Sequence, residues 1–371
     1  MSKAAELAKS GDTLTNQPSG RKNIVYNGAM KVAQRATSKT GIGANGGAYH
    51  TLDRIDMFFD ATAGRLTMSQ AADGPSGFAN CLKLDCTTAD ASIAAGEVAI
   101  LQYAIEGQDL QQLKKGTSDA EKVTVSFYVK GNANATYTLE LQDNDNSRHI
   151  AQTFNVTTGW TRVTKTFVAD TTDPLDDDNA ASLRIQIYLQ AGSTYTGGTF
   201  TSNTWADIVN GNTVKSDQTM FFDSTARTLS ITGLQLEVGP VATPFEHRSF
   251  GEELALCQRY YEKSYNHGTA LEAATDLGSL YAPGPVTGNL TTGSIGGTHA
   301  FMVSKRAAPT LVILDTAGNS GKCTRDNFGV GNEANSTVAT AFSSESAFLV
   351  HSSGSFNATT IIYHYTADAE L

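Results

Sequence analysis

Alternation of apolar and polar residues with a period of two is the feature that most restricts the fold of this chain. The clearest run lies at residues 183–189, where Leu, Ile, Ile and Leu are separated by Arg, Gln and Tyr. Successive side chains of a strand point to opposite faces, so such a run indicates a strand with one buried face. Similar runs at residues 82–86, 123–129 and 137–141 predict a series of antiparallel strands.

Turn-forming segments separate these runs. Residues 130–134 and 143–146 are rich in Gly, Asn and Asp. Short, regularly spaced strands without helical periodicity are typical of a sandwich or jelly roll. We therefore expect an all-β fold in which residues 23–248 form one jelly-roll-like antiparallel β-sandwich. In its last strand the apolar phase shifts at Gly233, which predicts a β-bulge at that residue.

A short helix is predicted directly after the sandwich. Ser249 followed by Glu252 has the spacing of a capping box, with Ser249 as the N-cap. Three apolar residues would share one face of this helix: Leu254, Cys257 and Tyr261. We assign residues 249–263 to a connecting helix, which packs either across its own sheet or against symmetry mates in a threefold neck.

The two ends of the chain differ from this central part. Residues 1–22 are polar and contain one weakly amphipathic stretch, which indicates either an arm that docks on a partner or a flexible leader. Residues 264–371 are rich in Gly, Ser and Thr and predict a second, smaller C-terminal β domain. Four strands are expected in this domain, at residues 300–303, 310–314, 347–350 and 360–365.

Composition excludes several classes of partner. The formal net charge of -10 disfavours binding to nucleic acid, because the field of the protein repels phosphates. No apolar run approaches the length of a membrane helix, and the first residues do not resemble a signal peptide, so we expect no membrane insertion and folding in the cytoplasm where the chain is made. The four cysteines do not form a metal-binding spacing and are expected to be buried free thiols.

No catalytic motif is visible in the chain. The seven histidines are scattered, and the HExxH, GxSxG and P-loop patterns are absent from the sequence. Carboxylates are plentiful, but no spacing distinguishes one pair as an acid and base. We therefore expect a protein that is not an enzyme.

One polar loop is a candidate ligand-binding segment. Residues 192–205 carry three aromatic side chains among hydroxyls and amides: Tyr195, Phe200 and Trp205. Exposed rings stack on the apolar faces of sugars, and neighbouring polar groups bind the sugar hydroxyls. The three aromatics are therefore candidate glycan-binding residues. The alternative is that their rings fold back and cap the sandwich.

An acidic run suggests one metal. Residues 170–179 contain several aspartates, and the carboxylates of Asp173, Asp176 and Asp178 are candidate calcium ligands. The run lacks the spacing of an EF-hand loop, so a solvated acidic loop is the alternative reading. No other cofactor is indicated.

Two stretches are more specific than the composition. Residues 23–35, Asn-Ile-Val-Tyr-Asn-Gly-Ala-Met-Lys-Val-Ala-Gln-Arg, followed by Tyr-His-Thr-Leu-Asp-Arg at 49–54, form the first. The second joins Ile-Thr-Gly-Leu-Gln-Leu-Glu-Val-Gly at 231–239 to residues 243–263, which begin Thr-Pro-Phe-Glu-His-Arg-Ser-Phe-Gly. In content and order these stretches resemble phage tail-fibre-like virion structural proteins.

This resemblance, which spans roughly residues 23–263, implies a carbohydrate-binding-module-like sandwich without a catalytic motif. It implies a structural component of a tailed bacteriophage virion, a short fibre or appendage subunit that attaches to a host-surface glycan. Residues 1–22 would then be a particle-attachment arm contacting other virion proteins, and a homotrimer is expected by analogy with phage fibres. Two alternatives stay open, namely a capsid-attached fibre or decoration protein and the carbohydrate-binding module of a glycan-degrading spike.

Overall fold

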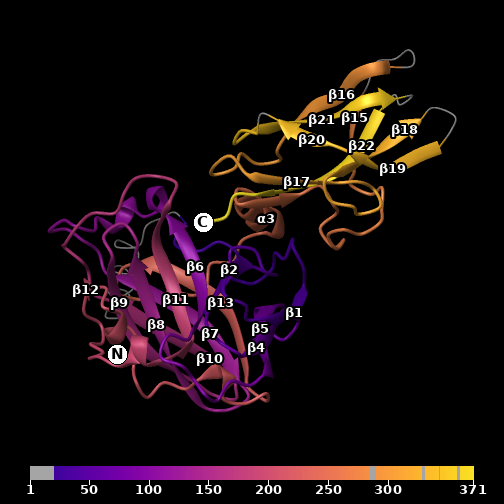
Figure 1. The fold of residues 1–371 in the computed structure, drawn as a ribbon. Coiled ribbons are helices and arrows are strands. Elements are labelled where there is room, and N and C mark those ends of the chain that lie inside the picture. Colours follow the sequence, from indigo (N-terminus) through magenta and orange to yellow (C-terminus); the bar gives the residue numbers. More distant parts are fainter. Residues whose placement is uncertain (1–20, 284–289, 328–330, 342, 357–359) are drawn as a thin grey trace.

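The chain forms two β-structured lobes, seen in a computed structural model that describes residues 21–283, 290–327, 331–341, 343–356 and 360–371 (Figure 1). The larger lobe is the β-sandwich, coloured indigo to salmon, and the smaller, orange to yellow, is the C-terminal lobe. The proposed arm at residues 1–22 lies outside the described residues except for its last two. In the described part of the chain, no helix has the length and apolarity that crossing a bilayer requires.

Two antiparallel sheets make up the sandwich. The six-stranded sheet has the order β1 (Ser38–Ile42), β4 (Arg65–Ala71), β5 (Cys81–Thr88), β13 (Thr228–Val238), β7 (Val123–Gly131) and β10 (Thr161–Phe167). The seven-stranded sheet has the order β12 (Ala206–Asp207), β9 (Arg148–Val156), β8 (Ala135–Asp143), β11 (Ala181–Ala191), β6 (Val98–Glu106), β3 (Asp56–Asp60) and β2 (Gly46–Tyr49). The predicted all-β fold is therefore confirmed.

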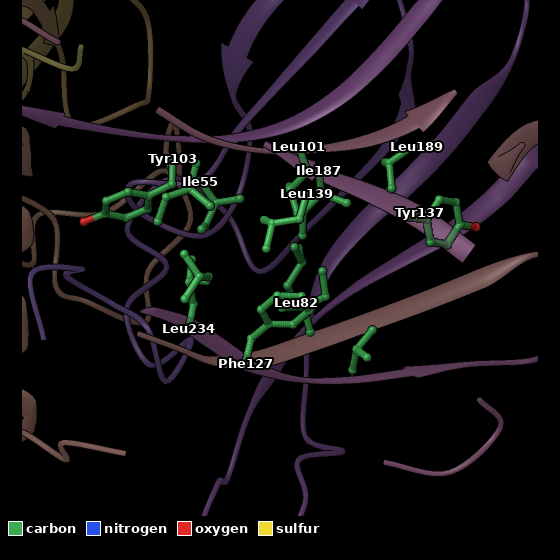
Figure 2. Packing of buried hydrophobic residues seen from close by; sticks show 14 of the residues in the cluster. Ile55, Leu82, Leu101, Tyr103, Phe127, Tyr137, Leu139, Ile187, Leu189 and Leu234 are labelled. Carbon is green, nitrogen blue, oxygen red and sulfur yellow. The ribbon is translucent and has the colours of Figure 1, made fainter. Parts of the chain in front are cut away.

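The core lies between the inner faces of these sheets (Figure 2). Leu82 and Phe127 come from the six-stranded sheet, and Leu101, Leu139 and Ile187 come from the other. All five are buried in one cluster. Burial of each such side chain stabilises the fold by roughly 1.5–3 kcal/mol relative to an exposed one. The period-two runs thus mark the core-facing residues.

Local signals in the sandwich are borne out by the structure. Gly233 has a φ of +65°, and the pairing of β13 with β7 changes register between Thr232 and Gln235. A side chain at Gly233 would also collide with the ring of Phe78, which lies 2.8 Å from the position of an added Cβ. The predicted bulge is confirmed. The four cysteines are buried free thiols, also as predicted.

The C-terminal lobe is built around one long strand, β22 (Thr360–Asp368). Its sheet also contains β14 (Tyr261–Lys263), β15 (Leu280–Pro283), β17 (Thr310–Leu314), β18 (Lys322–Asn327) and β19 (Gly331–Thr337). A three-stranded sheet is formed by β16 (Leu290–Ala300), β21 (Ala347–Phe356) and β20 (Ala339–Ala341). The strands expected at residues 310–314, 347–350 and 360–365 are present.

The strand predicted at residues 300–303 is wrong. Strand β16 ends at Ala300, and the next residues leave the sheet. Phe301 is buried because its ring packs on that of Phe348 at a centroid distance of 5.3 Å, whereas Met302 is 80% exposed. Phe301 therefore packs its ring in the core, and residues 301–303 do not continue the hydrogen-bonded sheet.

Short helical segments complete the fold. They are α2 (Ser193–Thr196), α3 (Phe250–Gln258) and the 3₁₀ turns η1 (Gly107–Asp109), η2 (Gln111–Leu113), η3 (Asn210–Asn212) and η4 (Phe221–Asp223). Helix α3 has the predicted N-cap, since the Ser249 hydroxyl accepts a hydrogen bond from the Glu252 amide. It is shorter than predicted, because Tyr261 and Lys263 pair with β22 as strand β14 instead of continuing the helix.

The two lobes meet at a polar junction beside α3 (Figure 1). Arg54, from the sandwich, is 1% exposed and pairs with Glu370, which follows β22. Arg35 pairs with Asp368 at 2.9 Å and with Glu370 at 3.3 Å. On the other side of the contact, Arg259 binds Glu106 at 2.7 Å. Helix α3 thus packs within its own chain at this junction.

The segments that carry the family resemblance meet at the same place. The carboxylate of Glu253 accepts a hydrogen bond from the Asn27 amide, and Arg248 donates to the Val25 carbonyl at 2.9 Å. Residues 23–35, 49–54 and 243–263 are distant in sequence but pack together here. Their polar residues hold one lobe to the other.

Candidate functional site

Polar side chains form a row on the outer face of the seven-stranded sheet. Because the core-facing residues of each strand alternate with outward-facing ones, Gln102, Gln186 and Glu140 point away from the core. Pairing places Gln102 opposite Gln186, and Gln186 opposite Glu140, so the three lie side by side on β6, β11 and β8. Asp56 of β3 extends the row, since it pairs with Gln102.

A second row beside this one is apolar. Phe58 pairs with Ile100, and Ile100 pairs with Tyr188. Ile100 and Tyr188 belong to a small buried cluster, separate from the main core, on which the rings of Phe58 and Tyr195 pack. A sheet face with one apolar and one polar row offers a ligand two different kinds of contact.

The segment that follows β11 crosses this face and turns it into a groove. Hydrogen bonds from Gly198 N to Gly211 O (2.8 Å) and from Val214 N to Tyr195 O (3.0 Å) hold the segment in place. The groove has a volume of about 250 Å³. It is lined by Phe58, Val98, Ile100, Gln102, Glu140, Gln142, Arg184, Gln186, Tyr188, Tyr195, Ile208, Asn210 and Thr213.

The carboxylate of Glu140 is already occupied within the protein. One oxygen lies 2.8 Å from Nδ1 of His149, and the other accepts a hydrogen bond from the Tyr188 hydroxyl at 3.0 Å. Burial, followed by the charge of Glu140, raises the pKa of Tyr188 well above its usual value. The Tyr188 phenol therefore stays protonated and donates its hydrogen bond. The hydrogen-bonded side chains of His149, Glu140 and Tyr188 hold one another in place at the floor of the groove.

Other polar groups of the groove are free to bind a ligand. Gln186 donates to Gln142 Oε1 at 2.6 Å, while its own Oε1 is buried without a partner among the residues that the structure describes. Arg184 forms no hydrogen bond or ion pair within that same part of the chain. Burial raises the pKa of Asp56 to about 6, so this neighbouring carboxyl takes up a proton at a higher pH than an exposed aspartate does but is still mainly ionised at neutral pH.

The three aromatic residues predicted to bind glycan are placed differently from one another. Tyr195 lines the groove, and burial raises the pKa of its hydroxyl. Trp205 packs against the main core at one end of the sandwich, where its indole nitrogen donates to the Val168 carbonyl at 2.9 Å. Phe200 is half-buried and does not line the groove. The structure therefore does not bring the three rings together.

The acidic run at residues 170–179 is held by a lysine. Lys115 Nζ lies 2.6 Å from Asp143 and 3.2 Å from Asp170, and it donates to the carbonyls of Thr172 (3.0 Å) and Asp173 (2.8 Å). The three aspartates proposed as calcium ligands are exposed: Asp173, Asp176 and Asp178. No group of three or more metal-binding side chains occurs among the described residues.

The sequence analysis did not predict the residues of the groove, although the sequence contains a signal for them. In the run at 183–189, the residues between the apolar ones are Arg184, Gln186 and Tyr188 rather than small solvent-facing residues. Gln186 and Tyr188 are buried despite their outward direction. Long polar and aromatic side chains on the outer face of several strands indicate that another segment packs on this face or that the face binds a ligand.

Comparison with known proteins gives only weak structural likenesses. No family model and no curated relative matches the chain. A family 4 carbohydrate-binding module is 14% identical with a TM-score of 0.29, and the match covers 57% of this chain and 97% of that one. The xylan-binding CBM22-1 domain from Paenibacillus barcinonensis Xyn10C is 10% identical with a TM-score of 0.29, over 61% and 100% of the two chains. The enzymatically active domain of tailspike protein 4 from bacteriophage CBA120 is 10% identical with a TM-score of 0.29; the match covers 58% of this chain and only 21% of the tailspike.

Proposed function

We propose that this chain is a glycan-binding protein rather than an enzyme, and that the groove on the seven-stranded sheet is its binding site. The observation that carries the proposal is the pair of rows on the outer face. The amides of Gln102, Gln142 and Gln186 both donate and accept hydrogen bonds, as neighbouring sugar hydroxyls require. The rings of Tyr195 and Phe58 offer flat apolar surface beside them, on which the face of a sugar ring stacks.

A pair of aromatic variants tests this location. Tyr195→Ala is expected to weaken glycan binding by about tenfold or more, because it removes stacking surface from the groove. Trp205→Ala is expected to leave binding unchanged and to lower the free energy of unfolding by about 2–3 kcal/mol, since Trp205 is a partly buried cap of the core. Binding is measured on an array of purified glycans and by calorimetric titration, and stability by urea unfolding. The reverse pattern would move the site to the end of the sandwich.

We also propose that the chain is a structural subunit of a tailed-phage virion, a short fibre that attaches to a host glycan. Support comes from the resemblance at residues 23–263, whose segments pack together at the junction between the lobes. In this proposal residues 1–22 attach to other virion proteins, the subunits form a homotrimer, and the C-terminal lobe extends from the sandwich.

Cryo-electron microscopy of purified particles of the encoding phage tests this second proposal. Threefold density at the tail that fits the two lobes is the expected result. Density on the capsid would favour the capsid-attached fibre or decoration protein instead. Absence of the chain from the particles would contradict the virion role. A separate assay for reducing ends released from host polysaccharide would identify a module of a glycan-degrading spike.

A further inference from the structure

Arg184 is the one cation among the side chains that line the described groove. It stands on β11 between Ala104 of β6 and Gln142 of β8. Its side chain is half-buried, and it has no hydrogen bond or ion pair with any residue in the described part of the chain.

Other arginines with comparable or deeper burial in the described part of the chain each have a partner, which is a carboxylate, a hydroxyl or a backbone carbonyl. Arg54 and Arg35 pair with Glu370, and Arg148 pairs with Asp170 at 3.1 Å. Partial removal of a guanidinium from water is costly unless a partner replaces the lost hydration. Arg184 is therefore an exception in its own structure, and its position in a groove points to a partner from outside the chain.

The nearest acidic groups do not fill that role. Both oxygens of Glu140 are engaged, by His149 and by Tyr188. Burial raises the pKa of Asp56 to about 6 although the charge of Arg184 lowers it, and the two side chains form no ion pair, so Asp56 acts on Arg184 only at longer range. The guanidinium thus faces the groove without a direct ion-pair partner among the described residues. Its planar fork of donors matches the two oxygens of a carboxylate.

We propose that Arg184 binds the carboxylate of an acidic sugar, so that the preferred ligand of the groove contains a uronic acid or a sialic acid. The inference rests on the proposed glycan-binding function and specifies its ligand class. Gln142 and Gln186, next to Arg184 on the same face, bind hydroxyls of the same sugar. The net charge of -10 opposes general adsorption of polyanions, so recognition depends on this one local contact.

The test begins with an array that contains neutral, uronate-containing and sialylated glycans. The bound acidic glycan is then titrated in its native form and after chemical reduction of its carboxyl groups. Reduction is expected to weaken binding by about tenfold to a hundredfold, because a charge-assisted contact is lost. Arg184→Gln is expected to weaken binding of the native glycan by a similar factor and to abolish the difference between the two forms, with Arg184→Lys between it and wild type.

Lys165→Gln provides the matched control, because it removes the same charge from β10 on the other sheet. It is expected to bind the native glycan as wild type does. Equal binding of neutral and acidic glycans, unaffected by Arg184→Gln, would overturn the acidic-sugar inference and leave glycan binding standing. Failure of the folded wild-type protein to bind any glycan would overturn the proposed function and this inference with it. If Arg184→Gln does not fold, the native and carboxyl-reduced ligands still decide the question with wild-type protein.

Discussion

Replacing Glu370 with Ala is expected to lower the free energy of unfolding by about 3–5 kcal/mol, because it leaves the buried guanidinium of Arg54 without its carboxylate partner at the junction between the lobes. Arg54 is 1% exposed, and the guanidinium stacks over the ring of Tyr260 at 3.5 Å from the ring centre. Its remaining partner would be the Ala104 carbonyl, a neutral acceptor 2.5 Å away. Arg35 is affected less, since it keeps the bond to Asp368.

The measurement is urea unfolding followed by circular dichroism, together with limited proteolysis to show whether the lobes separate. Asp73→Ala is the control, because Asp73 pairs with Lys130 at an exposed site where ion pairs contribute at most about 1 kcal/mol. Replacing Arg54 and Glu370 together with Met is expected to cost less than Glu370→Ala alone, since the guanidinium of Arg54 is then removed together with its partner and Arg35 keeps Asp368. A loss below about 1 kcal/mol for Glu370→Ala would show that the junction is hydrated and contributes little.

The junction also shows the limit of what the sequence predicts. The bulge at Gly233 and the cap at Ser249 depend on residues near them in the chain, and both were predicted correctly. The partners Arg54 and Glu370 are 316 residues apart. Nothing in the spacing of charges indicates such a pair, because the pairing is made by the packing of two complete lobes.

The groove could be predicted only in part for a related reason. Alternation within β11 shows that Gln186 points away from the core, but not which residues stand beside it. Its neighbours Gln102 and Glu140 come from strands β6 and β8, whose order in the sheet differs from their order in the chain. Tyr195 and Trp205 are close in sequence, yet the crossing segment places one in the groove and the other at the end of the core.

Lys115→Met is expected to destabilise the sandwich by about 3 kcal/mol. The ammonium is 6% exposed and balances two buried carboxylates, those of Asp143 and Asp170. Met keeps most of the side-chain volume but leaves Asp143 without a cation, and such removal of one buried partner is costly. Asp170 retains Arg148 at 3.1 Å, which is why the expected loss lies at the lower end of the range for buried pairs. Urea unfolding at neutral pH measures it.

The same site provides a test for calcium. Lys115 Nζ is surrounded by two carboxylate oxygens and two backbone carbonyls, a set of hard oxygen donors that also suits Ca²⁺. In the wild-type protein the ammonium takes this place, so the melting temperature is expected to be the same in EDTA and in millimolar calcium. In Lys115→Ala the four oxygens lose their cation, and added calcium is expected to restore part of the lost stability.

The melting temperature of the wild-type protein with and without calcium distinguishes the two hypotheses for the acidic run, a calcium site and a solvated loop. If EDTA lowers the melting temperature of the wild-type protein, a calcium ion binds elsewhere, and the exposed carboxylates of Asp173, Asp176 and Asp178 become its first candidates. If only Lys115→Ala responds to calcium, the ammonium group of Lys115 takes the place of a metal ion beside the acidic run at residues 170–179 in the wild-type protein. Since the Trp205 ring lies 5.4 Å from Lys115 Nζ, the end of the sandwich would then keep its shape whether or not calcium is present.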